Sequence, residues 1–138
     1  MNERAHVPME EMETHRIFVG ICDEIWGIVL RWDPLARDTV GKQMIRAADS
    51  VGANLVEGDG RYSDADALHF FVIARASARE TRYWLERAEV RDLVSPEVAE
   101  RLLKQLTNAT VKLNNLIRHR RDTKKADRIR DEQTEYDA

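Results

Sequence analysis

Four segments of the chain repeat apolar residues every three or four positions, which is the spacing of one face of an α-helix. The segments span about residues 12–32, 40–58, 63–91 and 96–117. In the first of them, Ile17, Ile21 and Ile25 follow one another at intervals of four. No alternation of apolar and polar residues competes with this period. The sequence therefore predicts an all-α fold.

The predicted helices have recognisable ends. Pro34 stops the first, because the residue before a proline is pushed out of the helical region. Gly58 follows the last helical residue of the second, where a glycine with positive φ caps a helix. Ser63 begins the third with a capping box, in which its hydroxyl and the Asp66 carboxylate each accept from the other residue's amide. Pro96 opens the fourth, at a position where its missing N–H costs nothing.

Short connections allow four amphipathic helices to bury their stripes only as antiparallel neighbours. The sequence therefore predicts an up-down-up-down antiparallel four-helix bundle. A chain of 138 residues forms one domain. We expect a flexible N-terminal segment over residues 1–11, the bundle over 12–120, and a charged tail over 121–138 that is frayed or disordered.

The compartment is indicated by one cysteine and by the absence of long apolar runs. Cys22 is the sole cysteine, so no internal disulfide forms. The first residues contain acids and no apolar run, and no segment approaches the roughly 18 apolar residues of a membrane helix. We therefore expect a cytoplasmic protein without a membrane partner. Cys22 has no histidine at helical spacing, and we interpret it as a small packed hydrophobe.

The stretch "SVGANLVEGDGRYSDAD", residues 50–66, contains three glycines among acids and one arginine. A phosphate loop needs a lysine and a hydroxyl after its last glycine, where this chain has Arg61 and Tyr62. A calcium loop needs oxygen ligands at alternating positions and a final glutamate, which are missing here. We interpret the stretch as a connector between the second and third helices.

A polar stripe follows the second predicted helix beside its apolar stripe. Its members are Gln43, Arg46, Ser50, Asn54 and Glu57, spaced three, four, four and three apart. In one interpretation they form a solvated rim. In the other, Arg46, Asn54 and Glu57 are partly buried and are satisfied by the third helix, through Arg75, Ser77 and Glu80. With Arg61 these eight residues make up the predicted polar network of nine. The second interpretation predicts that Arg46→Ala and Glu57→Ala destabilise the fold.

The residues around this stripe resemble those of a known family. "QMIRAADSVGANLVEGDGRYS", followed by "FFVIARASARE", resembles the signature of four-helix bundle proteins encoded in intervening sequences of bacterial 23S ribosomal RNA genes, also labelled S23 ribosomal proteins. The resemblance covers roughly residues 16–119. The matching positions are Gln43, Arg46, Ala47, Ser50, Asn54, Glu57, Gly58, Arg61, Ser63, Phe70, Ala74, Ser77 and Glu80.

The resemblance implies a ring-shaped homopentamer with no established enzymatic activity. It also implies a distant kinship to the accessory proteins of diversity-generating retroelements, which bind nucleic acid and a reverse transcriptase. The chain departs from the family pattern at Gly52, where proline is common, and at Ala76, where glycine is common. The segment after Pro34 is also one residue short. These departures concern packing and loop geometry.

The sequence predicts no catalytic residues, metal site, cofactor or small-molecule substrate. Asp66 and His69 imitate half of a di-iron motif, without a second copy. An enzyme built on Asn54, Glu57 and Glu80 is the least favoured interpretation, because no activated nucleophile accompanies them. The aromatic residues Trp26, Trp32, Tyr83 and Trp84 are interpreted as core or interface anchors, and Tyr62 as a subunit contact.

The strongest charge asymmetry lies near the C-terminus, in a chain whose net charge is -3. The basic residues there are Arg118, Arg120, Arg121, Lys124, Lys125, Arg128 and Arg130, and the last eight residues add four acids. We predict a non-enzymatic, oligomeric scaffold whose partner is itself. The alternative is a nucleic-acid-binding accessory that uses the basic residues 118–128 on RNA or DNA, since a ring would present them repeatedly.

Overall fold

The structure is a computed structural model that describes residues 6–137. All regular elements in this range are helical, and no strand is present in it. The elements in chain order are a 3₁₀ turn η1 (Met9–Glu11), α1 (Glu13–Val29), α2 (Pro34–Ala36), a π-helical stretch η2 (Arg37–Gly41), α3 (Lys42–Asp59), α4 (Asp64–Val90) and α5 (Pro96–Asp137). The predicted all-α fold is confirmed.

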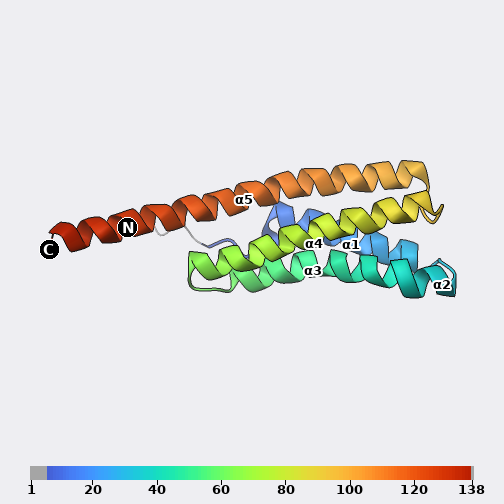
Figure 1. Ribbon diagram of the computed structural model, residues 1–138, viewed down its shortest axis with the longest axis horizontal. Helices are drawn as coiled ribbons and strands as arrows, with labels where there is room; N and C mark the ends of the chain where they lie inside the picture. Colours follow the sequence, from blue (N-terminus) through green and yellow to red (C-terminus); the bar gives the residue numbers. More distant parts are fainter. Residues whose placement is uncertain (1–5, 138) are drawn as a thin grey trace.

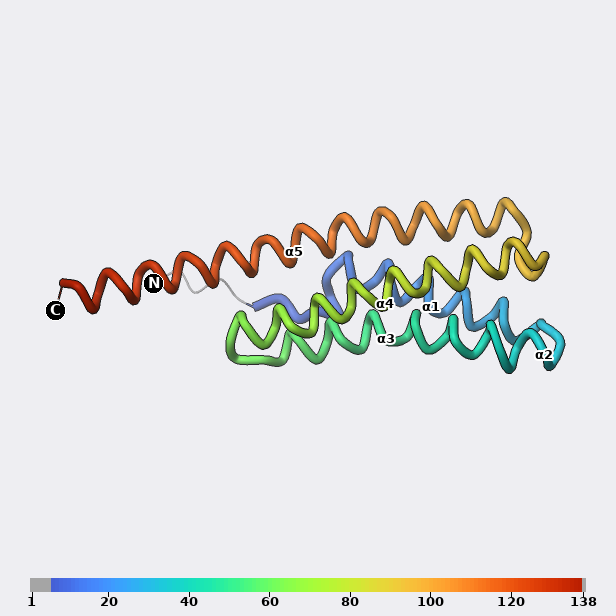
Figure 2. The backbone as a smooth tube through the Cα atoms, viewed as in Figure 1, coloured from blue at the N-terminus to red at the C-terminus, as the bar shows by residue number. Residues whose placement is uncertain are grey.

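The four long helices of this range lie side by side along the long axis of the molecule (Figure 1). α3 packs on α4 and α4 on α5, while α1 contacts both α3 and α5. Each long helix contributes apolar side chains to one core, whose largest fully buried members include Ile25, Met44, Leu55, Phe71, Leu85, Leu102, Leu106 and Leu113. α5 runs well past the ends of the other helices (Figure 2).

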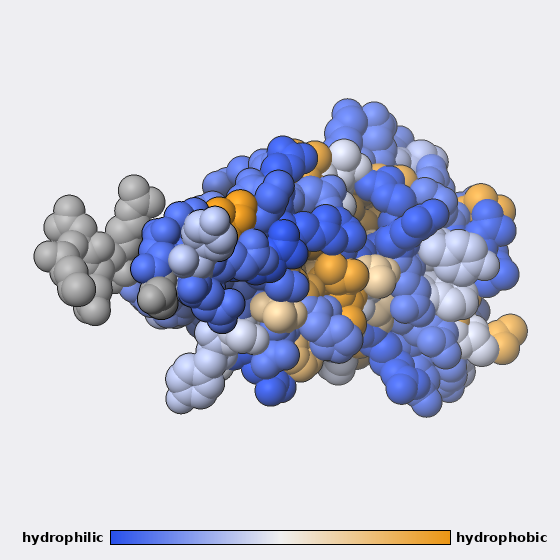
Figure 3. Space-filling model, turned by 60° about the vertical axis from the view of Figure 1, so that its left-hand side comes forward, coloured by the Kyte–Doolittle hydropathy of each residue, from blue (hydrophilic) through white to orange (hydrophobic). Residues whose placement is uncertain are grey.

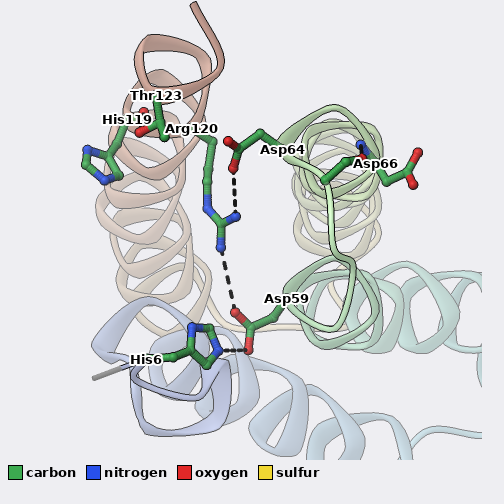
Figure 4. A network of polar contacts seen from close by, with 8 residues as sticks. His6, Asp59, Asp64, Asp66, His119, Arg120 and Thr123 are labelled. Carbon is green, nitrogen blue, oxygen red and sulfur yellow. Dashed lines mark hydrogen bonds and ion pairs between the residues drawn. The ribbon is translucent and has the colours of Figure 1, made fainter. Parts of the chain in front are cut away.

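Local capping explains where the helices begin. The Asp33 carboxylate accepts from the Ala36 amide at 3.1 Å, so the second helical region starts at Pro34 rather than near residue 40. The Ser63 hydroxyl accepts from the Asp66 amide at 3.2 Å, as predicted. The carboxylate of Asp66 points away from this turn, so the reciprocal half of the box is not formed (Figure 4).

Gly58 does not have the conformation that we predicted for it. It lies inside α3, and no glycine among the described residues has a positive φ. A Cβ at Gly58 would lie 2.9 Å from the Cβ of Phe70 and 2.9 Å from a ring carbon of Phe71. The glycine is therefore required by the close approach of α3 and α4, not by a turn. The left-handed residue is Asp92, with φ of 57°, between α4 and α5.

Both ends of the described chain are more ordered than the sequence predicted. Met9, within the segment 1–11 that we expected to be flexible, is only 1% exposed, and residues 1–5 lie outside the described range. α5 continues to Asp137, where we expected a frayed or disordered tail, and Ala138 lies outside the description. Its buried stripe ends at Ile117, and beyond it helix-forming residues continue the helix without a core.

Candidate functional site

A small polar cluster joins α3 to α4. The hydroxyls of Ser50 and Ser77 lie 2.9 Å apart. The amide of Asn54 donates to the Ser50 carbonyl at 2.8 Å and to its hydroxyl at 3.0 Å. Ser77 is buried and the other two are half-buried. Ser50 is therefore satisfied by the neighbouring helix through Ser77, whereas Asn54, which we expected to be satisfied by α4, bonds to Ser50 within α3.

The charged members of the stripe do not join this cluster. Arg46 and Glu57 are exposed, so the prediction that they are partly buried is wrong, and Gln43 is exposed as well. Glu57 contacts Arg61, whose guanidinium stacks 4.6 Å from the centre of the Phe70 ring. The spacing placed all five residues beside the apolar stripe, but of these five only Ser50 forms a hydrogen bond to α4.

The predicted partners on α4 also separate. Glu80 is exposed and accepts from the indole N–H of Trp84 at 3.2 Å. Arg75 turns to α5, where it donates to the side-chain oxygen of Asn114 at 3.1 Å. Only Ser77 bonds to the stripe on α3. The nine predicted residues therefore form several separate contacts rather than one network.

We expect Ser77→Ala to lower the free energy of unfolding by about 1 kcal/mol, because it leaves the half-buried Ser50 hydroxyl without its partner on α4. Arg46→Ala and Glu57→Ala should each change it by less than about 0.5 kcal/mol, since both side chains are exposed. Urea denaturation of the three variants beside the unchanged chain measures the difference. Equal urea midpoints for Ser77→Ala and Arg46→Ala would show that the hydrogen bond between Ser50 and Ser77 does not stabilise the fold.

A second cluster ties the N-terminal segment, α3, α4 and α5 together at one end of the bundle (Figure 4). Arg120 extends from α5 to the Asp64 carboxylate at 3.0 Å and to Asp59 at 3.9 Å. Asp59 also accepts from the Met9 amide at 3.0 Å and lies 3.2 Å from the His6 ring nitrogen. A single arginine therefore bridges the end of α3 and the start of α4.

Arg120 must be removed from the predicted nucleic-acid-binding residues. Its side chain is 24% exposed and its partner Asp59 is 12% exposed, and its guanidinium lies 5.7 Å from the centre of the Phe71 ring. A charge count along the sequence treats Arg120 like its neighbours, because the two aspartates that hold it are more than fifty residues away.

The other basic residues of the tail are exposed. Arg118, Arg121, Lys125 and Arg128 are spaced three, four and three apart, so α5 places them on one face. Lys124 is exposed beside them. Arg128 makes one weak surface pair, at 3.8 Å from Glu132. A face with four cations is therefore presented on the part of α5 that reaches beyond the core.

Cys22 is half-buried between α1 and α3 and donates its S–H to the Asp49 carboxylate. Burial and then the nearby carboxylate raise the pKa of the thiol from 9.0 to about 12. Our interpretation as a packed hydrophobe missed this hydrogen bond, which joins residues 27 positions apart. The environment holds the thiol neutral, the opposite of what an activated nucleophile needs.

We therefore expect iodoacetamide to alkylate Cys22 very slowly in the folded protein. A pKa of about 12 in place of 9.0 reduces the thiolate fraction at pH 8 about a thousandfold. Asp49→Asn removes the negative charge and should speed alkylation, as measured by mass spectrometry over time. A matched reaction in denaturant sets the rate of the free thiol. Equal alkylation rates for Cys22 in the folded and unfolded chains would show that the fold does not raise the pKa of this thiol.

The predicted aromatic anchors divide into two groups. Trp32 is half-buried and its indole N–H donates to the Leu93 carbonyl at 3.0 Å, which fixes the turn after α4. Trp84 is also half-buried. Trp26 and Tyr83 are each 53% exposed. Tyr62 is fully exposed in the connector between α3 and α4.

Three exposed apolar residues share the outer face of α1. Val19, Trp26 and the C-cap residue Leu30 are seven and four positions apart, so they lie on one stripe, which Asp23 interrupts and which we call the outer apolar stripe. Trp26 and Leu30 are 53% and 59% exposed. Trp26 was already interpreted as a core or interface anchor, but Val19 and Leu30 were missed because the inner stripe of α1 already explained the helix.

A groove of about 500 Å³ lies between α4 and α5 and is lined by three arginines. Arg75, Arg79 and Arg82 are spaced four and three apart along α4, and Val72 and Val111 border them. We call this the arginine groove; Ala76, Ala78, Thr107 and Thr110 complete its lining. The sequence analysis missed Arg79 and Arg82, although their helical spacing was visible.

No group of three or more histidine, cysteine, aspartate or glutamate side chains in residues 6–137 is arranged to hold a metal ion. In the same range, no helix has the length and apolar character needed to cross a bilayer.

Comparisons with known proteins place these features in context. The model of the 23S rRNA-intervening sequence protein family matches residues 10–115, which confirms the resemblance inferred from the motifs. A crystal structure of a protein with unknown function from the S23 ribosomal protein family of Bacteroides thetaiotaomicron superimposes with a TM-score of 0.70 at 25% identity. The match covers 75% of this chain and 97% of that one. No curated protein matches.

Proposed function

The chain belongs to the 23S rRNA-intervening sequence protein family, and on that premise we propose that it is a non-enzymatic scaffold that assembles with copies of itself. The subunit of this assembly is an up-down-up-down antiparallel bundle, and the assembly is a ring-shaped homopentamer in the cytoplasm. The observation that carries the proposal is the outer apolar stripe of α1.

The stripe supports self-assembly because its residues have no counterpart to cover them within the bundle. Tryptophan is enriched in protein interfaces relative to the rest of the surface, and here Trp26 shares one face with Leu30 one turn away and Val19 two turns away. Apolar groups also gather near the middle of the face seen in Figure 3, surrounded by hydrophilic residues. Patches of this kind mark contact surfaces. The free thiol of Cys22 fits a reducing compartment.

Light scattering coupled to gel filtration tests the assembly. The proposal expects five times the 16.0 kDa mass of one chain. Trp26→Ser combined with Leu30→Ser should reduce that mass, whereas the control Arg46→Ser, at an exposed position of α3, should retain it. A monomer at micromolar concentration for the unchanged chain would overturn the proposal.

The second candidate function is nucleic-acid binding by α5. It is favoured by the one-sided arrangement of Arg118, Arg121, Lys125 and Arg128, which a straight helix presents to a phosphate backbone. Arg120 takes no part, because it holds Asp59 and Asp64. A multimer would repeat the basic face, so that weak contacts add through effective concentration.

Fluorescence anisotropy with RNA and with duplex DNA across a salt series tests this candidate. Changing the four basic residues of that face to glutamine, with Arg120 kept, should weaken binding and flatten the dependence on salt. Each lost phosphate contact on duplex DNA removes about 0.9 from the slope of log K against log salt. Unchanged affinity and slope would remove α5 from nucleic-acid binding.

A further inference from the structure

The arginine groove carries positive charge that the bundle does not neutralise. None of the ion pairs formed within residues 6–137 involves Arg75, Arg79 or Arg82. Arg75 donates to Asn114, and Arg82 donates to the Leu103 carbonyl at 3.1 Å. These neutral acceptors orient the two guanidinium groups without cancelling their charge. No carboxylate lines the groove.

The groove also has an apolar part, so its complement is not a simple anion. Val72 and Val111 border it from the two helices, and both are exposed, at 37% and 54%. A partner that covers this surface needs carboxylates for the arginines and apolar side chains for the valines. An amphipathic helix with acidic residues supplies both groups at the spacing of a groove between two helices.

The far end of α5 has this composition. Residues 129–137, which we call the acidic end, contain four acids, Asp131, Glu132, Glu135 and Asp137, against one arginine, Arg130, together with two exposed apolar residues. Ile129, Glu132 and Tyr136 are three and four positions apart, so one face of the helix combines apolar groups with a carboxylate. Ile129 is half exposed and Tyr136 almost fully exposed. This end lies beyond the residues that the family model matches.

The acidic end does not reach the groove of its own chain. α5 is one continuous helix from Pro96 to Asp137, and it carries the acidic end away from the bundle (Figure 2). Tyr136 lies 25 residues beyond Val111, which at 1.5 Å per residue places it about 37 Å along the helix from the groove. Any contact between the two surfaces therefore joins different molecules.

We propose that the acidic end of α5 docks in the arginine groove of a second copy of this chain. Glu132 and Glu135 face the guanidinium groups of the groove, and Ile129 and Tyr136 cover its valines. The contact joins two different surfaces, so it links copies head to tail, which is the kind of contact that closes into a ring or extends as a filament. The inference rests on the proposed self-assembly and identifies one of its contacts.

Charge reversal tests the docking. Arg79 is the groove residue to change, because it is exposed and forms none of the hydrogen bonds that orient Arg75 and Arg82. One variant carries Arg79→Glu, a second carries Glu132→Lys and Glu135→Lys, and a third combines all three changes. Arg46→Glu, at the exposed arginine of α3 that also serves as the control for the outer apolar stripe, is the matched control. Sedimentation velocity over a concentration series gives the association constant of each.

Each of the first two variants should weaken association about tenfold or more, and the combined variant should recover it, because the reversed charges attract again. The control should associate like the unchanged chain. If the unchanged chain assembles and the variants assemble equally well, this inference is overturned and the proposed function stands. If the unchanged chain is monomeric, both the proposed self-assembly and this docking contact are overturned. The same Arg79→Glu variant is also tested for RNA binding by fluorescence anisotropy. If the change weakens RNA binding but leaves assembly unchanged, the groove binds nucleic acid and the docking proposal is overturned.

Discussion

Replacing Gly58 with alanine is expected to lower the free energy of unfolding by about 2 kcal/mol, although alanine is the better helix former. The added methyl group would sit 2.9 Å from the Cβ of Phe70 and from the Phe71 ring. Phe71 is fully buried and cannot move aside without opening the core, and the Phe70 Cβ is fixed to the backbone of α4. The overpacking therefore exceeds the gain in helix propensity.

The control is Gly20→Ala on α1, where a Cβ would have nothing within 4 Å. There only the helix propensity acts, so this change should raise the free energy of unfolding by about 0.5–1 kcal/mol. Chemical denaturation of both variants at one protein concentration compares them directly. Two shifts of the same sign would show that α3 and α4 do not approach as closely as described.

The second large effect is expected for Arg120→Ala, which should lower the free energy of unfolding by about 2 kcal/mol. Removal of the guanidinium leaves Asp59 and Asp64 as neighbouring carboxylates without their shared cation. It also removes the stacking on the Phe71 ring and the link between α5 and the connector of α3 and α4. The loss lies below that of a fully buried pair because the site keeps some contact with water.

Arg121→Ala provides the comparison, since this neighbour is exposed. It should change the unfolding free energy by less than about 0.5 kcal/mol. Adding Asp59→Asn and Asp64→Asn to Arg120→Ala should recover part of the loss, because amides tolerate the absence of the cation. If Arg120→Ala and Arg121→Ala unfold at the same denaturant concentration, the cluster in Figure 4 contributes nothing to stability.

The long helices, and the starts of α4 and α5, were predictable because their causes are local. Apolar spacing, the Ser63 N-cap and the proline at position 96 depend only on neighbouring residues, and the structure agrees with them, whereas the second helical region starts at Pro34 instead of near residue 40. The role of Gly58 could not be predicted from the sequence, because it depends on which side chains of α4 lie against this glycine. The order of the tail was missed for a different reason: we expected residues 121–138 to be frayed or disordered because the buried stripe does not continue there, but local propensity continues the helix to Asp137.

The candidate surfaces were predicted unevenly for the same reason. The spacing of Ser50 and Asn54 indicated a shared face, and in the structure Asn54 bonds directly to Ser50, which in turn bonds to Ser77 of α4. Nothing local distinguished them from Arg46, which is exposed. Arg120 looked like its basic neighbours until the fold brought Asp59 and Asp64 beside it. Residues whose role depends on a partner distant in sequence require the fold before they can be assigned.

The unbroken length of α5 gives its far end, which we call the arm, a defined reach and a defined rotational orientation. The 17 residues from Arg121 to Asp137 extend about 25 Å, and the Arg120 clamp sets the rotational phase with which they leave the bundle. Deleting seven residues from the arm, almost two whole turns, would shorten its reach but leave the acidic end pointing in the same direction around the helix axis. Shortening it by two would turn its acidic end toward the opposite side.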